Sequence, residues 1–247
     1  MRLAPVLLSL AIAVLALPTA AQNPLVADLS EHQIQITTGF TGTDVLLFGT
    51  VDEESDVVVV VRGPTQQTTV WRKGRFAGIW VNDQRVVFDD VPSFFAVRSS
   101  SPLEEITSDT IRARHGMGAN FLRLRTADKS ITSVELAEFR AGLIRNKRRL
   151  GLFAAEDERI NFLGGQLFRT RLFFPANVPT GFYDVEVFMI RDGRVAHAQT
   201  TPLIVSKAGL GADVFFFAHR YSAFYGILAI ILAAAAGALA AFVFRKN

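Results

Sequence analysis

The densest cluster of side chains that could do chemistry lies in a stretch of ten residues near the middle of the chain. Its cations are Arg140, Arg145, Lys147, Arg148 and Arg149. Guanidinium groups bind phosphates, sulfates and carboxylates through paired hydrogen bonds, so the cluster is a candidate basic patch for an anionic ligand, a lipid headgroup or an acidic partner. A solvated helix face is the alternative, because the helix dipole stabilises cations near a C-terminal end.

No catalytic constellation accompanies this patch. The sequence lacks a phosphate-binding loop, a G-x-S-x-G elbow and an H-E-x-x-H zinc motif. Its histidines are scattered, without a second ligand at suitable spacing: His32, His115, His197 and His219. Gly116-Met117-Gly118, between arginine-rich flanks, is either an anion-binding nest or a flexible basic loop. We therefore expect a protein that is not an enzyme and that holds no metal or cofactor.

Charge and cysteine content exclude further classes. The basic residues Arg2, Arg245 and Lys246 lie in the terminal segments and account for the formal net charge of +3. The region between those segments is therefore neutral, and no nucleic-acid partner is expected, because nucleic-acid binding needs a basic face. The chain has no cysteine, which excludes disulfides and thiol chemistry.

An apolar segment without a charged residue, Ala223 to Phe244, organises the rest of the chain. A helix of this length reaches about 33 Å, enough to cross a hydrocarbon core of about 30 Å. Lys and Arg beside a span mark the cytoplasmic side, and Arg245 and Lys246 follow directly. We expect a transmembrane helix over 223–244 and a cytoplasmic tail of 245–247.

The N-terminus supports the same topology. Residues 1–21 combine a basic start, an apolar stretch and the small-residue sequence Thr19-Ala20-Ala21, which is the pattern of a secretory signal peptide. A retained signal anchor is the alternative. Either interpretation places residues 22–222 outside the cytoplasm.

Strand patterns occupy most of this exported region. Alternation predicts strands at Gln33–Thr37 and Asp44–Val51, after a polar lead-in over Gln22–Ser30. The run Val57–Val61 is too short for a helix and predicts a strand covered on both faces. Further strands are expected over about 68–98 and 167–205, the last two joined at the hairpin signal Asp192-Gly193.

Helical spacing interrupts the strands over about 99–163. Thr132-Ser133-Val134-Glu135 has the form of a capping box and predicts a helix from Thr132 to Leu150, with a weaker helix from Pro102 to about Arg114. In the helix predicted from Thr132 to Leu150, four apolar residues fall near one face: Leu136, Phe139, Leu143 and Leu150.

The fold class expected from these patterns is mainly β. We predict an immunoglobulin-like antiparallel β-sandwich over 22–207 with a helical insertion over about 99–163, followed by a linker and interfacial collar over 208–222. The collar is aromatic: Phe215, Phe216, Phe217 and Tyr221. Two separate small domains are the alternative.

The apolar segment carries a stripe of small side chains at every fourth residue: Ala229, Ala233, Gly237 and Ala241. Such a stripe lets another helix approach closely, and it is a candidate helix-packing surface. The segment is so rich in alanine that a stripe is also expected by chance.

Several motifs resemble an uncharacterised family of single-span transmembrane proteins from alphaproteobacteria, over nearly the whole mature chain. They are Val61-Arg62-Gly63-Pro64, Trp71-Arg72-Lys73, Gly78-Ile79-Trp80-Val81-Asn82, Ser93-Phe94-Phe95-Ala96-Val97, Pro102-Leu103 and Phe174-Pro175-Ala176-Asn177-Val178-Pro179-Thr180-Gly181-Phe182-Tyr183. The family has no established activity, so no site residue is carried over. The resemblance implies a bacterial periplasm and the inner membrane, and a role beside permeases of the sulfite-exporter type. From the residues alone, Trp71 and Trp80 are expected to be core aromatics.

Two functions follow from these observations. The first is a non-enzymatic accessory or interaction subunit of a membrane transport complex, anchored in the inner (cytoplasmic) membrane with its N-terminal domain in the periplasm. The second is an independent periplasmic module that binds or senses a small anion or an envelope polymer through the basic insertion.

Overall fold

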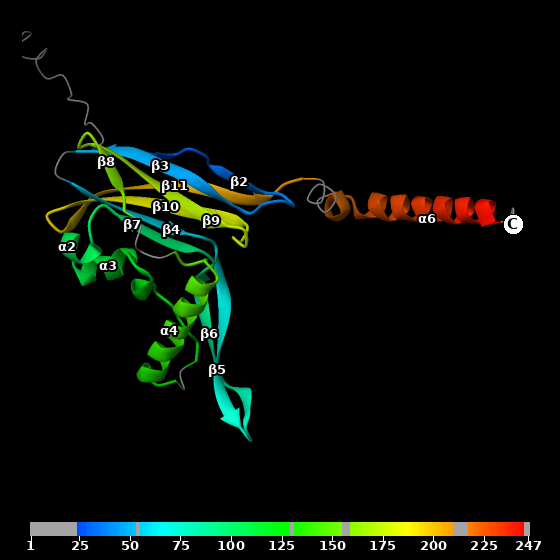
Figure 1. Ribbon diagram of the computed structural model, residues 1–247, viewed down its shortest axis with the longest axis horizontal. Coiled ribbons are helices and arrows are strands. Elements are labelled where there is room, and N and C mark those ends of the chain that lie inside the picture. Colours follow the sequence, from blue (N-terminus) through cyan, green and yellow to red (C-terminus); the bar gives the residue numbers. More distant parts are fainter. Residues whose placement is uncertain (1–23, 53–54, 129–130, 155–158, 210–216, 245–247) are drawn as a thin grey trace, which may run out of the picture.

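The computed structural model describes residues 24–52, 55–128, 131–154, 159–209 and 217–244. Strands dominate, and one long helix lies near the C-terminus (Figure 1). The chain is therefore mainly β, as its sequence predicts. The predicted signal peptide, the tail over 245–247, and the collar residues Phe215 and Phe216 lie outside the described residues.

Most strands form two sheets. The four-stranded sheet has the order β1-β3-β9-β8, made of Leu25–Leu29, Gly42–Val51, Leu167–Pro175 and Asn161–Leu163. The five-stranded sheet has the order β2-β11-β10-β4-β7, made of Gln33–Ile36, Arg194–Lys207, Gly181–Arg191, Asp56–Arg62 and Phe95–Ser99. β2 pairs with β11 in parallel, whereas the other strand pairs of the two sheets are antiparallel.

The valine run forms β4, in the interior of the five-stranded sheet, and all five side chains are 0% exposed. Val57, Val59 and Val61 belong to a buried cluster that both sheets share. Val58 and Val60 point to the opposite face and join a second cluster. The prediction of a strand covered on both faces is confirmed, and the physical reason is the two-residue period of a strand between two apolar layers.

Helices cover the second cluster on the side away from the five-stranded sheet. They are α2 (Leu103–Ile106), α3 (Asp109–His115), the single 3-10 turn η1 (Ala119–Phe121) and α4 (Ser133–Arg149). The capping box of α4 is present: the Thr132 hydroxyl accepts a hydrogen bond from the Glu135 N–H, and the Glu135 carboxylate accepts one from the Thr132 N–H. The predicted weaker helix is divided into α2 and α3, because Thr107 is extended.

A long hairpin completes this layer. β5 (Thr65–Phe76) and β6 (Ile79–Pro92) pair with each other and project beyond the two sheets (Figure 1). Near its base, Val70, Val86 and Phe88 are buried in the second cluster beside α4. Ala77 and Gly78 form the tight turn at the far end, and both have positive φ, as a two-residue type I′ turn requires.

One tyrosine fixes the entry to β10. The ring of Tyr183 is buried against Phe94 and Phe174, with ring centroids 5.9 Å away in each case. Its hydroxyl donates a hydrogen bond of 2.5 Å to the carbonyl oxygen of Pro179, four residues earlier. Burial raises the pKa of Tyr183 to about 12. The contact resembles the tyrosine corner that closes the E–F connection of many two-sheet domains.

Three expectations from the sequence are wrong. Residues 25–29 of the predicted polar lead-in form β1, whose alternation Leu25, Ala27, Leu29 faces the shared core. Leu150 is exposed, because the helix ends at Arg149 and Gly151 takes a left-handed conformation. Trp71 and Trp80 lie on the projecting hairpin and are 47% and 68% exposed, so they are not core aromatics.

Candidate functional site

An open cleft lies on the four-stranded sheet, with a volume of about 720 Å3. It is lined by Ser30, Asp44, Leu46, Arg159, Asn161, Arg169, Thr170 and Arg171. Arg169 and Arg171 are two residues apart on β9, so their side chains leave the same face of the strand. Arg171 pairs with Leu46 of β3, and Arg169 lies between Phe48 of β3 and Asn161 of β8. We call this surface the arginine cleft.

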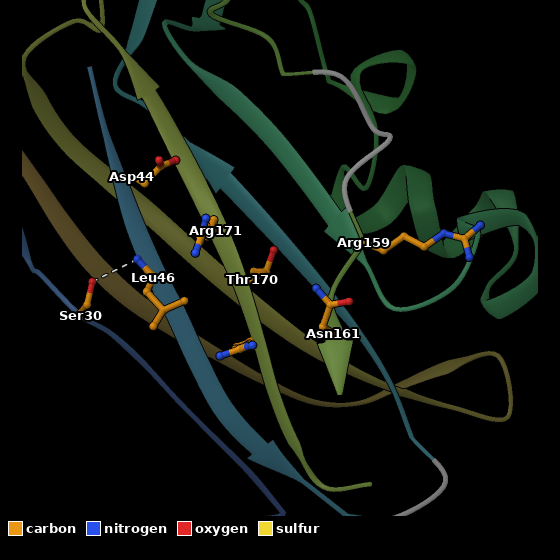
Figure 2. A pocket seen from close by; sticks show the side chains of 8 residues that line it. Ser30, Asp44, Leu46, Arg159, Asn161, Thr170 and Arg171 are labelled. Carbon is orange, nitrogen blue, oxygen red and sulfur yellow. Dashed lines mark hydrogen bonds between the residues drawn. The ribbon is translucent and has the colours of Figure 1, made fainter. Parts of the chain in front are cut away.

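The two cations of β9 are available to a ligand. Among the described residues, neither Arg169 nor Arg171 forms an ion pair or a side-chain hydrogen bond, and both are exposed. Figure 2 shows Arg171 on β9 beside Thr170, with Asp44 on the neighbouring strand. Arg159 starts at the rim and its side chain extends away from β9 toward the helices (Figure 2). The arrangement offers two guanidinium forks to an oxyanion and one carboxylate at the edge of the cleft.

Backbone hydrogen bonds hold the segments at the edge of the cleft. Ser30 and Leu46 exchange two hydrogen bonds, from the Ser30 N–H to the Leu46 carbonyl at 2.8 Å and from the Leu46 N–H to the Ser30 hydroxyl at 3.0 Å. Ile160 donates to the carbonyl of Ser99 at 3.0 Å, and this contact holds the segment of Arg159 against the end of β7.

The predicted basic patch is divided by the structure. Arg140 turns inward and donates hydrogen bonds to the carbonyl oxygens of Asn120 and Leu122, and burial lowers its pKa. Lys147 is only 6% exposed, and burial lowers its pKa as well. Arg145, Arg148 and Arg149 remain on the exposed side of α4. Of the five predicted cations, Arg140 bonds inward to backbone carbonyls, Lys147 is buried, and three are left at the surface.

Gly116-Met117-Gly118 does not form an open anion nest, because its three N–H groups donate to the backbone carbonyls of Arg112 and Gly116. Gly116 caps α3 in a left-handed conformation, and Met117 is fully buried. Arg62, at the end of β4, donates to the carbonyl of His115 and to the carboxylate of Glu186 on β10. Burial lowers the pKa of Arg62, opposed by the nearby Asp184 carboxylate. This group joins α3 to the five-stranded sheet.

The predicted helix-packing stripe lies on α6 (Ser222–Phe244). Ala229, Ala233, Gly237 and Ala241 are all exposed, and a Cβ added at Gly237 would meet no atom within 4 Å. None of the apolar window Ser222–Ala241 is buried against the rest of the described chain. Of the predicted collar, Phe217 and Tyr221 contact each other, with ring centroids 5.7 Å apart.

The end of the hairpin carries a group of exposed apolar side chains that the sequence did not reveal as such. Phe76 and Ile79, a cross-strand pair next to the turn, are 71% and 63% exposed, and Trp80 pairs with Arg75 one step further back. The strands expected over about 68–98 cover only parts of β5 and β6, and a hairpin that extends beyond the core has no distinctive sequence pattern. The arginine cleft was missed for a related reason: Arg169 and Arg171 simply occupy the exposed positions of a predicted strand.

These features define the class of the protein. Within the described residues, the chain is mainly β and has one exposed apolar helix that is long enough to cross a bilayer, which makes it a membrane protein with one candidate span at its C-terminal end. The chain belongs to the family described as "Putative transmembrane protein (Alph_Pro_TM)", which matches residues 24–246. The resemblance noted from the sequence motifs is confirmed. No curated protein and no solved structure matches the chain.

Proposed function

We propose that the protein is a non-enzymatic accessory subunit of a membrane transport complex, which binds an anionic ligand beside the membrane. The observation that carries this proposal is the pair of guanidinium groups of Arg169 and Arg171, which have no partner among the described residues and lie in an open cleft of about 720 Å3. Arginine pairs on a rigid strand suit phosphate, sulfate and carboxylate groups, because the planar forks are held at a fixed spacing. α6 would keep this site close to the bilayer surface.

The proposal includes an immunoglobulin-like sandwich as the scaffold of the cleft. The orders β1-β3-β9-β8 and β2-β11-β10-β4-β7 would correspond to A-B-E-D and A′-G-F-C-C′ of that fold, and Tyr183 lies near the start of the F strand, β10. In this scheme the hairpin and helices are an insertion on the C–C′ side. The cleft then lies on the outer face of the A-B-E-D sheet, opposite to the insertion.

The proposed topology follows the charges at the termini. A cleaved signal peptide over residues 1–21 and the basic tail of Arg245 and Lys246 would place the β domain in the periplasm and the C-terminus in the cytoplasm. The proposed membrane is the inner (cytoplasmic) one. An integral permease of the sulfite-exporter type is the proposed partner, and the small-residue stripe of α6 is its proposed contact.

Ligand binding is tested on the full-length protein in mild detergent. Calorimetric titration with sulfate, phosphate and a sulfated oligosaccharide should give saturable heat for at least one of them. The double variant R169Q/R171Q should weaken that binding about tenfold or more, because each charged hydrogen bond contributes roughly 1.5–3 kcal/mol before solvent screening reduces it. The matched control R145Q/R149Q removes two exposed arginines of α4 and should bind like the wild type. If the α4 variant alone loses binding, the site is the predicted basic patch and the cleft assignment is wrong.

The independent binding module remains the second candidate, favoured by the fact that the arginine cleft needs no partner to be formed. The two functions differ in what purifies with the protein. A tagged chain extracted from native membranes should bring a stoichiometric permease if it is an accessory subunit, identified by mass spectrometry against an unrelated single-span control. The double variant A233L/G237L should remove that permease while leaving anion binding intact. Recovery of the chain alone, with binding preserved, would support the independent module.

A further inference from the structure

We propose that the β5–β6 hairpin is a second membrane contact, which inserts its tip into the surface of a bilayer rich in anionic lipids. The tip consists of residues 73–82, from Lys73 to Asn82 around the Ala77-Gly78 turn. This contact is independent of the arginine cleft and of any transport partner.

The tip has the composition of a segment that enters a lipid headgroup region. Phe76, Ile79 and Trp80 are exposed on it, and no other part of the described chain packs over them. Lys73 and Arg75 are its charged residues; the nearest carboxylate in sequence, Asp83, directly follows the tip, and its side chain lies against Gly74. Aromatic and aliphatic side chains flanked by cations bind at the boundary of headgroups and acyl chains, and each cation adds attraction to anionic lipids.

The hairpin is held stiffly enough to act as a support for this tip. Its twelve-residue strand β5 extends roughly 40 Å at about 3.3 Å per residue. Directly behind the tip, Arg72 lies over the ring of Phe139 on α4, 5.6 Å from the centroid, and 3.4 Å from the Glu138 carboxylate. Trp71 is covered in a similar way by Arg85, at 5.7 Å. These contacts fix the proximal half and leave the tip free.

Strand register places the base of the hairpin at the end of the domain from which the chain leads to α6. Arg62, the last residue of β4, pairs with Asp184 of β10, and Asp184 pairs with Pro202 of β11. β11 continues from there to Lys207, from which a short segment leads to α6. Because the hairpin begins directly after β4, it leaves the five-stranded sheet at the end from which the chain proceeds to the membrane helix. A bilayer is favoured over a protein partner, because α6 already requires a bilayer next to this end of the domain.

The fluorescence of the native tryptophans can report this contact. The two tryptophans both lie on the hairpin, and α6 contains none. Trp80 is next to the tip pair, but Trp71 lies five residues from Phe76, about 17 Å back along the strand. Insertion to a depth of about 5–10 Å would bury Trp80 and leave Trp71 outside the lipid.

The test uses full-length protein reconstituted into vesicles whose acyl chains are brominated, because bromine quenches tryptophan on contact. In phosphatidylcholine vesicles containing phosphatidylglycerol, the wild type should lose up to about half of its emission relative to unbrominated vesicles, since only one of the two tryptophans inserts. The variant W71F, in which Trp80 is the sole tryptophan, should lose most of its emission. In pure phosphatidylcholine the quenching should be several-fold smaller.

Variants separate the two parts of the contact. F76S/I79S should abolish quenching, and K73Q/R75Q should reduce it to the level seen in pure phosphatidylcholine. V134S, which alters an equally exposed apolar residue on α4, should behave like the wild type. The proposal is overturned if W71F is not quenched in anionic vesicles, if quenching is equal in both lipid mixtures, or if F76S/I79S is quenched like the wild type. Shielding of Trp80 from aqueous iodide by a co-purified protein, without bromolipid quenching, would identify the hairpin as a protein-binding element instead.

Discussion

Replacement of Gly49 by alanine tests the packing that holds the arginine cleft together. Gly49 lies in β3, paired with Ala27 of β1 and Phe168 of β9. A Cβ at this position would lie 2.3 Å from the Val26 carbonyl oxygen, 2.6 Å from Cζ of Phe168 and 2.9 Å from the Ala27 Cα. Two of these three atoms are backbone, so β1 as a whole must move to admit one methyl group.

The expected magnitude follows from this geometry. Overpacking of a well-packed core costs about 1–3 kcal/mol, and displacement of a paired strand places Gly49→Ala at the upper end, at about 3 kcal/mol. For a chain of this size the melting temperature shifts by roughly 2–4 °C per kcal/mol, which gives a decrease of about 6–12 °C. Gly39→Ala is the matched control, because its added Cβ would meet no atom within 4 Å and its φ lies outside the left-handed region. It should change stability by less than about 1 kcal/mol, in the favourable direction if any.

The measurement is thermal unfolding of the full-length protein in mild detergent, followed by far-ultraviolet circular dichroism in the strand region. Tryptophan fluorescence is unsuitable, because Trp71 and Trp80 lie on the hairpin outside the core. If Gly49→Ala melts within about 2 °C of Gly39→Ala, β1 accommodates the methyl group without loss, and the close-packing argument for this sheet is wrong.

Three further outcomes are expected. Glu186→Gln removes the carboxylate that pairs with the half-buried Arg62, and it should lower the free energy of unfolding by about 1–2 kcal/mol in chemical denaturation. This value is smaller than that for a fully buried pair, because both side chains are partly exposed. An unchanged free energy of unfolding would show that Asp184 alone balances Arg62. Lys147→Met keeps a buried aliphatic side chain and removes a cation whose pKa is lowered by burial, so the melting temperature should rise by a few degrees. A lower melting temperature would show that the hydrogen bond from Lys147 to the Ser93 carbonyl, at 3.5 Å, stabilises the protein. The pKa of His115 is lowered by burial and by Arg114 and Arg62, so the unfolded chain binds a proton first as the pH falls below 6.5. His115→Phe should therefore retain more of its neutral-pH stability than the wild type between about pH 6.5 and 5, measured by denaturation at each pH, and parallel curves would contradict the assignment.

Local patterns in the sequence were sufficient for much of the fold. The capping box at Thr132 predicts the start of α4, because two backbone donors at a helix start need acceptors within four residues. Asp192-Gly193 predicts the hairpin between β10 and β11, and both residues have the positive φ that such a turn demands. The five valines predict burial on both faces, since no solvent-facing position breaks the run.

The functional surfaces depended on long-range packing. Alternation assigns Arg169 and Arg171 to one face of β9. That face becomes part of a cleft only because β3 and β8 lie beside β9, and β3 is more than one hundred residues away in the sequence. Cation clustering along α4 gave no means of separating the half-buried Arg140 and the buried Lys147 from the exposed arginines.

The sequence by itself determined the apolar span, the strand and helix types and the family, because each is encoded by periodicity, length or local motif. The tertiary structure decided which faces are covered. It buried Lys147, exposed Trp71 and Trp80 on a hairpin beyond the core, and placed that hairpin at the end of the sheet nearest α6. The physical reason is that a two-residue or 3.6-residue period shows which side chains share a face, whereas solvent exposure depends on what the rest of the chain lays against that face.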